Sequence, residues 1–259
     1  PNFAEDIAGV RSVIPDRMLQ YDMPSSQGEF VGIDAVGDPP FSGSEDLLFD
    51  LQWGHNAVRA QQAWAHGVRG QGVRVAVLDG GFDLTHPDLV PNINFELSRS
   101  FVPDQGLEWG LVDPRSHGTH VAGIIAAAQN DFGIIGVAPD AELLLVKVLR
   151  DGGTGAFSWL AAGILYATDA GADVINMSLG ALLAQSGICV GAPGVNCVTP
   201  NEIAEFRVLM NRVTSYAYQQ GVTIIAGAGN NGFNRDFTAD LLFMPADMPH
   251  VFFMLPRPP

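Results

Sequence analysis

Four short apolar runs, spaced along the chain, constrain its fold more than any other feature. Residues 73–78, 143–149, 173–177 and 222–226 are rich in Val, Ile and Leu and do not alternate strictly with polar residues. This composition is typical of strands that are buried on both faces, as they are in parallel sheets. Helical segments lie between the runs, and parallel strands need such crossover connections. The pattern therefore predicts an α/β fold, with a mostly parallel central sheet flanked by helices on both faces.

Three predicted helices follow from local signals. Residues 56–66 repeat apolar side chains at helical spacing and stop at a glycine, a residue type common just past a helix end. Residues 158–171 carry the same spacing, with Ser158 as the expected N-cap. The sequence TPNE at residues 199–202 is a capping box with proline at the first helical position, and it opens a helix that ends before Gly221.

Composition narrows the classes of partner. The chain has 28 acidic and 13 basic side chains, which gives a net charge of -15. Such a charge repels a phosphate backbone and anionic lipid, so we expect no nucleic-acid binding. The apolar runs are far shorter than the roughly 20 residues that a membrane-spanning helix needs, so we expect no membrane span. Because 47% of the 259 residues are apolar, the chain can bury a sizeable core.

The two cysteines, Cys189 and Cys197, lie close together in a stretch rich in glycine and proline. A short loop closed by a disulfide is geometrically easy there. Two free thiols are an equally good interpretation, because isolated cysteines are often small buried hydrophobes. A bridge, if formed, would indicate an oxidising compartment.

Small and polar residues follow the predicted strands, at the sheet edge where ligands and catalytic groups gather. Asp79 follows the first strand, residues 178–180 follow the third, and Asn230 follows the fourth. His117 stands at the predicted start of a further helix, in SHGTHVAG. A carboxylate that orients an imidazole, and an imidazole that takes a proton from a nucleophile, are two parts of a catalytic triad. Asp79 and His117 fit these roles, and the Asn230 amide could donate to a developing oxyanion.

Other interpretations of these residues stay open at this point. An aspartate that ends a strand is often a turn former or a helix cap. His117 and His120 could bind a metal from one helical face, although the glutamate and third ligand of the helical zinc motifs are missing. The glycine-rich turn at residues 227–232 could hold phosphate, but no lysine follows it, and Lys147 is the one lysine of the chain.

Five motifs, in order, make the chain resemble the subtilisin-like serine peptidases: VAVLDGGFDLTHPDL, SHGTHVAGIIAA, NDFGIIGVAP, ADVINMSLG and VTIIAGAGNNG. The resemblance implies a secreted serine endopeptidase, made as a zymogen, that hydrolyses polypeptide substrates through an acyl-enzyme. It gives Asp79 the role of orienting carboxylate, His117 that of general base and Asn230 that of oxyanion donor. A physical argument agrees: a residue at the helix start projects into the cleft, whereas His120, one turn further in beside Val121 and Ile124, is expected to make a hydrogen bond within the core.

The resemblance also implies a cleft in which an extended substrate pairs with the enzyme as a strand. An edge strand would pair with one side of the substrate, and an opposing rail with the other. The edge strand would be formed by Ser178, Leu179 and Gly180, and the rail by Gly153, Thr154 and Gly155.

A structural calcium ion is a further implication of the resemblance. Its ligands would be the Asp88 carboxylate, the Asn130 side-chain amide and the main-chain carbonyls of Ala128, Phe132 and Ile134. Oxygen ligands of these kinds suit a hard cation. An acid nearer the N-terminus, such as Asp46, would complete the site.

The chain departs from the family at two places. Gly80 follows Asp79 where the family usually has serine or threonine, so we expect the carboxylate to be held less firmly. The family's nucleophilic serine lies in a Gly-Thr-Ser-Met-Ala-x-Pro motif beyond the oxyanion asparagine, yet residues 231–259 contain no serine. Ser116 is expected to have the wrong geometry beside His117, and Ser215, the last serine, lies in a predicted helix.

These departures lead to a prediction for the organisation of the chain. Residues 1–23 resemble the tail of an inhibitory propeptide, residues 24–45 are a Ser/Gly/Pro-rich linker, and residues 46–259 are the first two thirds of a catalytic domain. The ending FFMLPRPP is not expected to pair as a strand, because prolines interrupt it, and the fold would be incomplete at the C-terminus. We therefore expect a fragment that is inactive as written.

Two rival functions remain. The first is a non-catalytic peptide-binding pseudoprotease that kept the cleft without the serine. The second is a metal-dependent hydrolase that uses His117 and His120.

Overall fold

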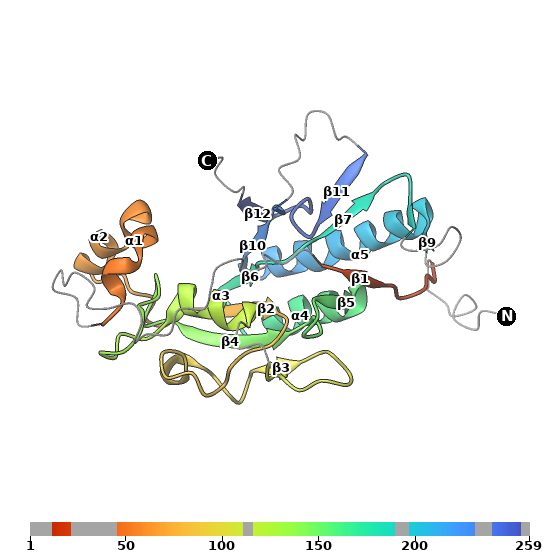
Figure 1. The fold of residues 1–259 in the computed structure, drawn as a ribbon. Coiled ribbons are helices and arrows are strands. Elements are labelled where there is room, and N and C mark those ends of the chain that lie inside the picture. The colour runs from red at the N-terminus through yellow and green to blue at the C-terminus, as the bar shows by residue number, and fades with distance from the viewer. Residues whose placement is uncertain (1–11, 22–45, 111–115, 190–196, 231–239, 255–259) are drawn as a thin grey trace.

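A six-stranded sheet forms the centre of the molecule (Figure 1). The computed structural model describes residues 12–21, 46–110, 116–189, 197–230 and 240–254. Every neighbouring pair of strands in this sheet is parallel. The strands, in their order across the sheet, are β12 (Val251–Met254), β10 (Thr223–Gly227), β6 (Val174–Met177), β2 (Arg74–Asp79), β4 (Glu142–Lys147) and β3 (Arg99–Ser100).

The predicted strands are confirmed as the four central strands β10, β6, β2 and β4. Each lies within two residues of its predicted bounds. The agreement follows from burial, since Val77, Leu78, Leu144, Leu145 and their neighbours in β2 and β4 are fully buried. Strands with both faces covered need apolar residues at successive positions, and this makes them visible in the sequence.

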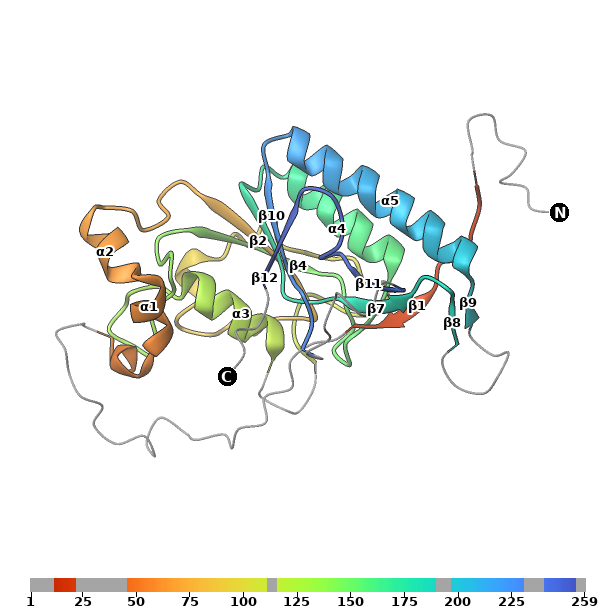
Figure 2. The same ribbon diagram turned by 90° about the horizontal axis from the view of Figure 1, so that it is seen from above.

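Helices cover both faces of the sheet, as predicted (Figure 2). Alternate residues of β2 point into two separate cores, Val75 and Val77 into one and Ala76 and Leu78 into the other. Helix α3 (His117–Ala126) packs on the first core, whereas α4 (Phe157–Asp169) and α5 (Pro200–Gln219) lie side by side on the second. The α/β architecture is therefore confirmed.

The helix boundaries correct two predictions. Residues 56–66 belong to two short helices, α1 (Trp53–Val58) and α2 (Ala60–Ala65), because Arg59 between them is left-handed with φ of 60°. Ser158 is not an N-cap, since α4 begins at Phe157 with Ala156 as its N-cap. The capping box of α5 is confirmed, with Thr199 and Glu202 bonded to each other's backbone amides.

The end of the described chain corrects a third prediction. β12 pairs in parallel with β10, with Val251 opposite Ile224, although this segment was not expected to form a strand. The prolines of FFMLPRPP are residues 256, 258 and 259, so they follow the paired residues instead of interrupting them. The strand itself, Val-Phe-Phe-Met, has the apolar composition of its neighbours.

Three two-stranded ladders lie around the central sheet. They join β1 (Met18–Gln20) to β5 (Thr154–Ala156), β7 (Ala181–Ala184) to β11 (Leu241–Met244), and β8 (Ile188–Cys189) to β9 (Cys197–Val198). Cys197 is disulfide-bonded, and Cys189 stands directly across from it in the β8–β9 register. The described residues also include two short 3-10 helices, Phe49–Leu51 and Val90–Asn92. Among the described residues, no helix is long and apolar enough to cross a bilayer.

Candidate active site

The carboxyl ends of the central strands place the predicted site residues at one edge of the sheet. Asp79 is the last residue of β2 and pairs in register with Lys147, the last residue of β4. Ser178 directly follows β6, and Asn230 comes three residues after β10. These residues therefore lie at the edge of the sheet that the sequence predicted for them.

Asp79 and His117 are in direct contact. The Nδ1 atom of His117 lies 2.9 and 3.0 Å from the two carboxylate oxygens of Asp79. The Asp79 side chain is fully buried, whereas 13% of the His117 side chain is exposed. The amide of Gly80 also donates to Oδ1 of Asp79, at 2.7 Å. This geometry fixes the ring by one nitrogen and leaves the other, Nε2, for a reacting partner.

The contact with Asp79 stabilises the protonated form of the His117 imidazole more than water would. Burial alone would lower the pKa of His117, but the hydrogen bond and the negative charge of Asp79 outweigh it and raise that pKa above its usual range. A histidine held in this way can accept a proton from a nucleophile and carry it as a stabilised imidazolium. The pair therefore has the chemistry of a general base with its orienting carboxylate.

Ser116 caps the helix that presents His117. Its hydroxyl accepts a hydrogen bond from the amide of Thr119, at 3.2 Å, and donates to the carbonyl of Gly81, at 2.8 Å. With these bonds the side chain is committed to the helix N-terminus and to the turn after β2. The expectation that Ser116 is not the nucleophile agrees with this geometry.

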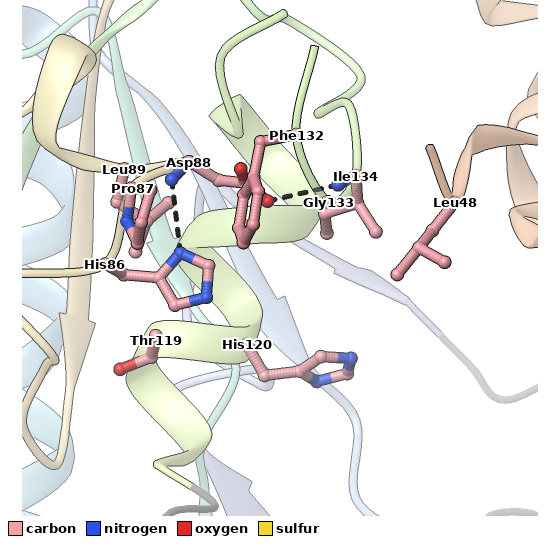
Figure 3. Close-up of a pocket in the computed structure, with 11 residues that line it drawn as sticks. Leu48, His86, Pro87, Asp88, Leu89, Thr119, His120, Phe132, Gly133 and Ile134 are labelled. Carbon is pink, nitrogen blue, oxygen red and sulfur yellow. Dashed lines mark hydrogen bonds between the residues drawn. The ribbon is translucent and has the colours of Figure 1, made fainter. Parts of the chain in front are cut away.

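His120 corrects a prediction, because it is exposed and does not lie within the core. It borders a cavity of about 300 Å³ between α3 and the loop that follows it (Figure 3). The residues that line this cavity include His86, Asp88, Thr119, His120, Phe132 and Ile134. Although the residue as a whole is exposed, partial desolvation of its imidazole, together with the neighbouring His117 imidazole, lowers the pKa of His120. Within the described ranges, no group of three or more His, Cys, Asp and Glu side chains is placed to hold a metal ion.

The predicted rail holds a strand in the structure. β5 pairs antiparallel with β1, so that Thr154 lies opposite Gln20, and Gly155 opposite Leu19. The amide of Tyr21 extends this ladder by donating to the carbonyl of Gly153, at 3.0 Å. The rail is therefore able to bind an extended segment through its backbone, and the segment bound here belongs to the same chain.

The opposing side of the predicted cleft lies between β6 and β7. Ser178, Leu179 and Gly180 connect these strands and belong to no strand among the residues described. Leu179 is almost fully buried. The pairing of these residues with a substrate stays a prediction, as does the oxyanion role of Asn230, which is exposed.

The predicted calcium ligands lie around the loop after α3. Oδ2 of Asp88 accepts a hydrogen bond from the amide of Ile134, at 3.0 Å, while its Oδ1 is buried and accepts none (Figure 3). Oδ1 of Asp46 accepts from the amide of Asn130, at 3.0 Å. The amide of Ala128 donates to the main-chain carbonyl of Asp88, at 2.7 Å. The structure therefore brings the Asp46 and Asp88 carboxylates to the loop that carries the other predicted ligands, and the calcium site stays a prediction.

Burial raises the pKa of both Asp46 and Asp88, which contact this loop, with the charge of Asp46 adding to the shift of Asp88. Main-chain amides of the loop oppose the shift in each case, and the charge of His86 also opposes it at Asp88. These opposing interactions offset the burial of the two carboxylates only in part.

Sequence analysis missed two buried groups, one beside Asp79 and one beside the rail. Lys147 is fully buried beside Asp79. The signal that could have revealed it is a lysine inside the otherwise apolar run LLLVKVL, because a buried lysine needs a partner. Tyr21 is 2% exposed and packs in the core beneath the rail. No local pattern could have placed Tyr21 there, because its partners lie more than a hundred residues away along the chain.

Comparison with known proteins identifies relatives of this chain. The model of the subtilase family matches residues 70–248. The chain is 37% identical over 211 residues to the major intracellular serine protease of Bacillus subtilis (strain 168), covering 80% of this chain and 59% of that protein. It is 41% identical over 182 residues to subtilisin BL of Lederbergia lenta, covering 70% and 56% respectively.

A solved structure shares the fold. Fervidolysin from Fervidobacterium pennivorans, a keratinolytic enzyme related to subtilisin, superposes with a TM-score of 0.62 at 28% identity, covering 92% of this chain and 33% of that one. The chain thus spans little more than half the length of the curated relatives named above.

Proposed function

The chain belongs to the subtilase family, and we propose that it forms the Asp–His part of a serine endopeptidase active site. The observation that carries the proposal is the contact of His117 Nδ1 with both carboxylate oxygens of Asp79. In this proposal a serine hydroxyl attacks the peptide carbonyl while its proton passes to Nε2 of His117. His117 then gives that proton to the leaving amine, and water hydrolyses the acyl-enzyme by the same route.

The proposal needs a serine that residues 231–259 do not contain. Ser116 is committed to its helix cap, and Ser215 lies within α5. We propose that the nucleophile belongs to polypeptide beyond residue 259 and that Asn230 donates to the oxyanion formed in the attack. By itself, the chain of 259 residues should then show no proteolysis.

A comparison of two proteins tests this function. The product of the coding sequence, read past residue 259, should cleave casein and react with a serine-directed fluorophosphonate, and His117→Ala should remove both properties. The 259-residue chain should do neither. Casein cleavage by the longer product that ignores the fluorophosphonate and stops only with a zinc chelator would overturn the triad.

A peptide-binding pseudoprotease is the second candidate, and the pairing of β5 with β1 favours it. This rail binds an extended segment without any chemistry. If the coding sequence stops after residue 259 and the chain binds extended peptides without cleaving them, this second function is correct.

Residues 12–21, here called the N-terminal segment, are proposed to be the tail of an inhibitory propeptide. Beyond its pairing with β5, the segment makes charged contacts with the two helices on that face. Asp16 accepts hydrogen bonds from the amide and hydroxyl of Ser158, near the start of α4. Arg17 donates through Nε and Nη2 to Oε1 of Glu202, at 3.0 and 2.9 Å, at the start of α5. A segment held in this way would keep a polypeptide substrate from the rail.

Calcium is proposed as a structural ion of the loop after α3. The buried Oδ1 of Asp88 accepts no hydrogen bond, and burial raises the pKa of both Asp88 and Asp46, so a cation there would stabilise two carboxylates. Asn130 and the carbonyls of the same loop supply the neutral oxygens that calcium prefers. Calorimetric titration of the chain with CaCl₂ should show one site, and its absence would contradict the proposal.

Secretion is proposed on the strength of the disulfide. Cys197 is disulfide-bonded, and stable disulfides are rare in a reducing cytosol. The relative from Bacillus subtilis is named as an intracellular protease, so relatives do not decide the compartment. Alkylation of the denatured protein, purified from its source without reductant, should detect no free thiol, whereas two reactive thiols would argue for the cytosol.

A further inference from the structure

Two consecutive glycines follow the orienting carboxylate, and both of their carbonyls are held by buried side chains. Lys147 Nζ donates to the carbonyl of Gly80, and the Ser116 hydroxyl donates to that of Gly81. Gly80 also donates its own amide to Oδ1 of Asp79. Because glycine is the most flexible residue of the backbone, the direction of these peptide groups depends on the donors that hold them.

Lys147 is itself fixed by a second group of contacts. Its ammonium forms an ion pair with Asp151, whose side chain is 8% exposed. The other carboxylate oxygen of Asp151 accepts from the amide of Gly110, at 3.1 Å, and the amide of Asp151 donates to Gln105, at 3.1 Å. The pair thereby joins the turn after β2 to the loop at residues 105–110 and to the start of the rail.

The glycine at position 81 leaves room for this arrangement. Its φ is 127°, and a Cβ atom there would lie 2.6 Å from Nζ of Lys147 and 3.2 Å from Asp151. An L-residue would therefore both strain the backbone and displace the ammonium. Glycine at position 81 is therefore what allows the turn and the Lys147–Asp151 ion pair to lie against each other.

A buried ion pair of this kind is not explained by stability. Taking the two charges out of water costs several kcal/mol per ion, and replacing such pairs with apolar residues is often neutral or stabilising. Burial lowers the pKa of Lys147, and the bond to Asp151 with the charges of Asp151 and Asp79 only partly offsets this. The contacts of the pair with the turn after Asp79 offer a different reason for its presence.

We infer that Lys147, held by Asp151, is a positioning residue for the Asp79–His117 pair. Lys147 holds the carbonyl of the Gly80–Gly81 peptide group, next along the chain from the Asp79–Gly80 group whose amide donates to Asp79, and so restricts the turn that positions the carboxylate. Ser116 connects the same turn to the first turn of α3, which carries His117. The inference rests on the proposed function only in that it takes the Asp79–His117 pair to be catalytic. The effect of Lys147 on the geometry of that pair can be measured without any nucleophile.

The imidazole of His117 reports directly on the inference. The double variant Lys147→Met/Asp151→Asn removes the ion pair with side chains of similar size. Among the described residues, Asp79 contacts His117, Lys147 and Asp151 interact with each other and with Asp79 or its turn, and His120 lies on the same helix. The double variant removes one cation and one anion, so their opposite effects on the pKa of His117 largely cancel, whereas loss of the contact with Asp79 would lower that pKa and weaken the Nδ1–H hydrogen bond. A lowered pKa together with a weaker Nδ1 proton signal therefore separates positioning from simple charge.

The experiment is a pH titration of the His117 ring by NMR in the 259-residue chain. The double variant should lower the pKa of His117 and weaken the downfield Nδ1 proton signal, in the direction set by Asp79→Asn. The matched control is Arg74→Met/Glu142→Gln, which removes an ion pair between β2 and β4 at the ends of these strands opposite to Asp79 and Lys147. The control should leave both signals unchanged. An unchanged or raised pKa in the Lys147 variant would overturn the inference.

Two further measurements keep the test decisive. If the double variant does not fold, Asp151→Asn alone keeps an acceptor for Lys147. Because loss of the Asp151 charge lowers the pKa of His117 by itself, the readout for this variant is the downfield Nδ1 proton signal, which should weaken by less than in the double variant; an unchanged signal would again overturn the inference. In the longer product, the same variants should lower kcat and move the acid limb of kcat/KM to lower pH. An NMR shift without any change in catalysis would leave the positioning intact and refute the proposed function instead.

Discussion

Tyr21 provides a test of whether the N-terminal segment is a separable occupant of the rail. Its side chain is 2% exposed, its amide donates to the carbonyl of Gly153, and its hydroxyl is buried with no hydrogen-bond partner. Truncation of a buried aromatic ring to alanine costs about 3 kcal/mol at the low end of measured values. Because each 1.4 kcal/mol is about tenfold in an equilibrium constant, Tyr21→Ala should increase the undocked population roughly a hundredfold.

The matched control is Tyr21→Phe. It removes only the hydroxyl, and a buried hydroxyl without a partner costs free energy in the folded state. Docking of the segment in this variant should therefore be unchanged or stronger. The raised pKa of Tyr21, caused by burial and by the charge of Asp16, is consistent with a hydroxyl that water does not reach.

Amide hydrogen exchange under native conditions distinguishes the possible outcomes. In Tyr21→Ala, exchange should accelerate about a hundredfold in β1 and β5 and stay unchanged in β2 and β4. Tyr21→Phe should match the unmodified chain. Equal acceleration in the central strands would show that the segment is part of the cooperative core, and no acceleration anywhere would show that Tyr21 does not hold it. Either result would refute the docked-segment reasoning.

Three further predictions concern stability. Because the pKa of His117 is raised in the folded state, its pairing with Asp79 contributes fully to the free energy of unfolding below about pH 6. This contribution is lost as the pH rises through the folded-state pKa. Urea unfolding should therefore show stability falling with pH across this range, and Asp79→Asn should reverse the sign of that dependence. Calcium at a hundred times its dissociation constant should add about 2.7 kcal/mol, seen as a higher Tm that a chelator removes, and a Tm gain that survives in Asp88→Asn would contradict the assigned site. Thr199→Ala breaks the capping box of α5 and should cost about 1 kcal/mol in denaturant unfolding, whereas an unchanged midpoint would mean that the cap is redundant.

The sequence predicted best where a local rule and the tertiary environment agree. The central strands are buried on both faces, so their apolar composition is a direct consequence of their place in the sheet. The capping box of α5 satisfies its own helix end, so four consecutive residues carried all the information. The Asp79–His117 pair was predicted from positions at strand and helix ends that the fold brings to one edge.

Prediction failed where distant residues decide local structure. Ser158 has the composition of an N-cap, but the helix begins one residue earlier and Asp16, from the N-terminal segment, bonds to it. His120 was assigned to the core from its apolar neighbours, yet Ile124 one turn away is also exposed. The apolar strand β12 was dismissed because of prolines that lie beyond its paired residues. In each case the decisive partner or boundary lay outside the pattern that was used.

Gly80 connects these observations with the chemistry of the site. A glycine after the orienting carboxylate removes the side chain that the family usually has there, and it predicted a loosely held carboxylate. The structure shows what acts in its place: the Gly80 amide bonds to Asp79, and Lys147 holds the Gly80 carbonyl from the neighbouring strand. The Lys147 ammonium can hold this backbone only if it is itself fixed in place. Asp151 fixes it, at the cost of a buried ion pair. The single lysine of an acidic chain is thus placed where its replacement together with Asp151 should disturb His117 more than it disturbs the fold.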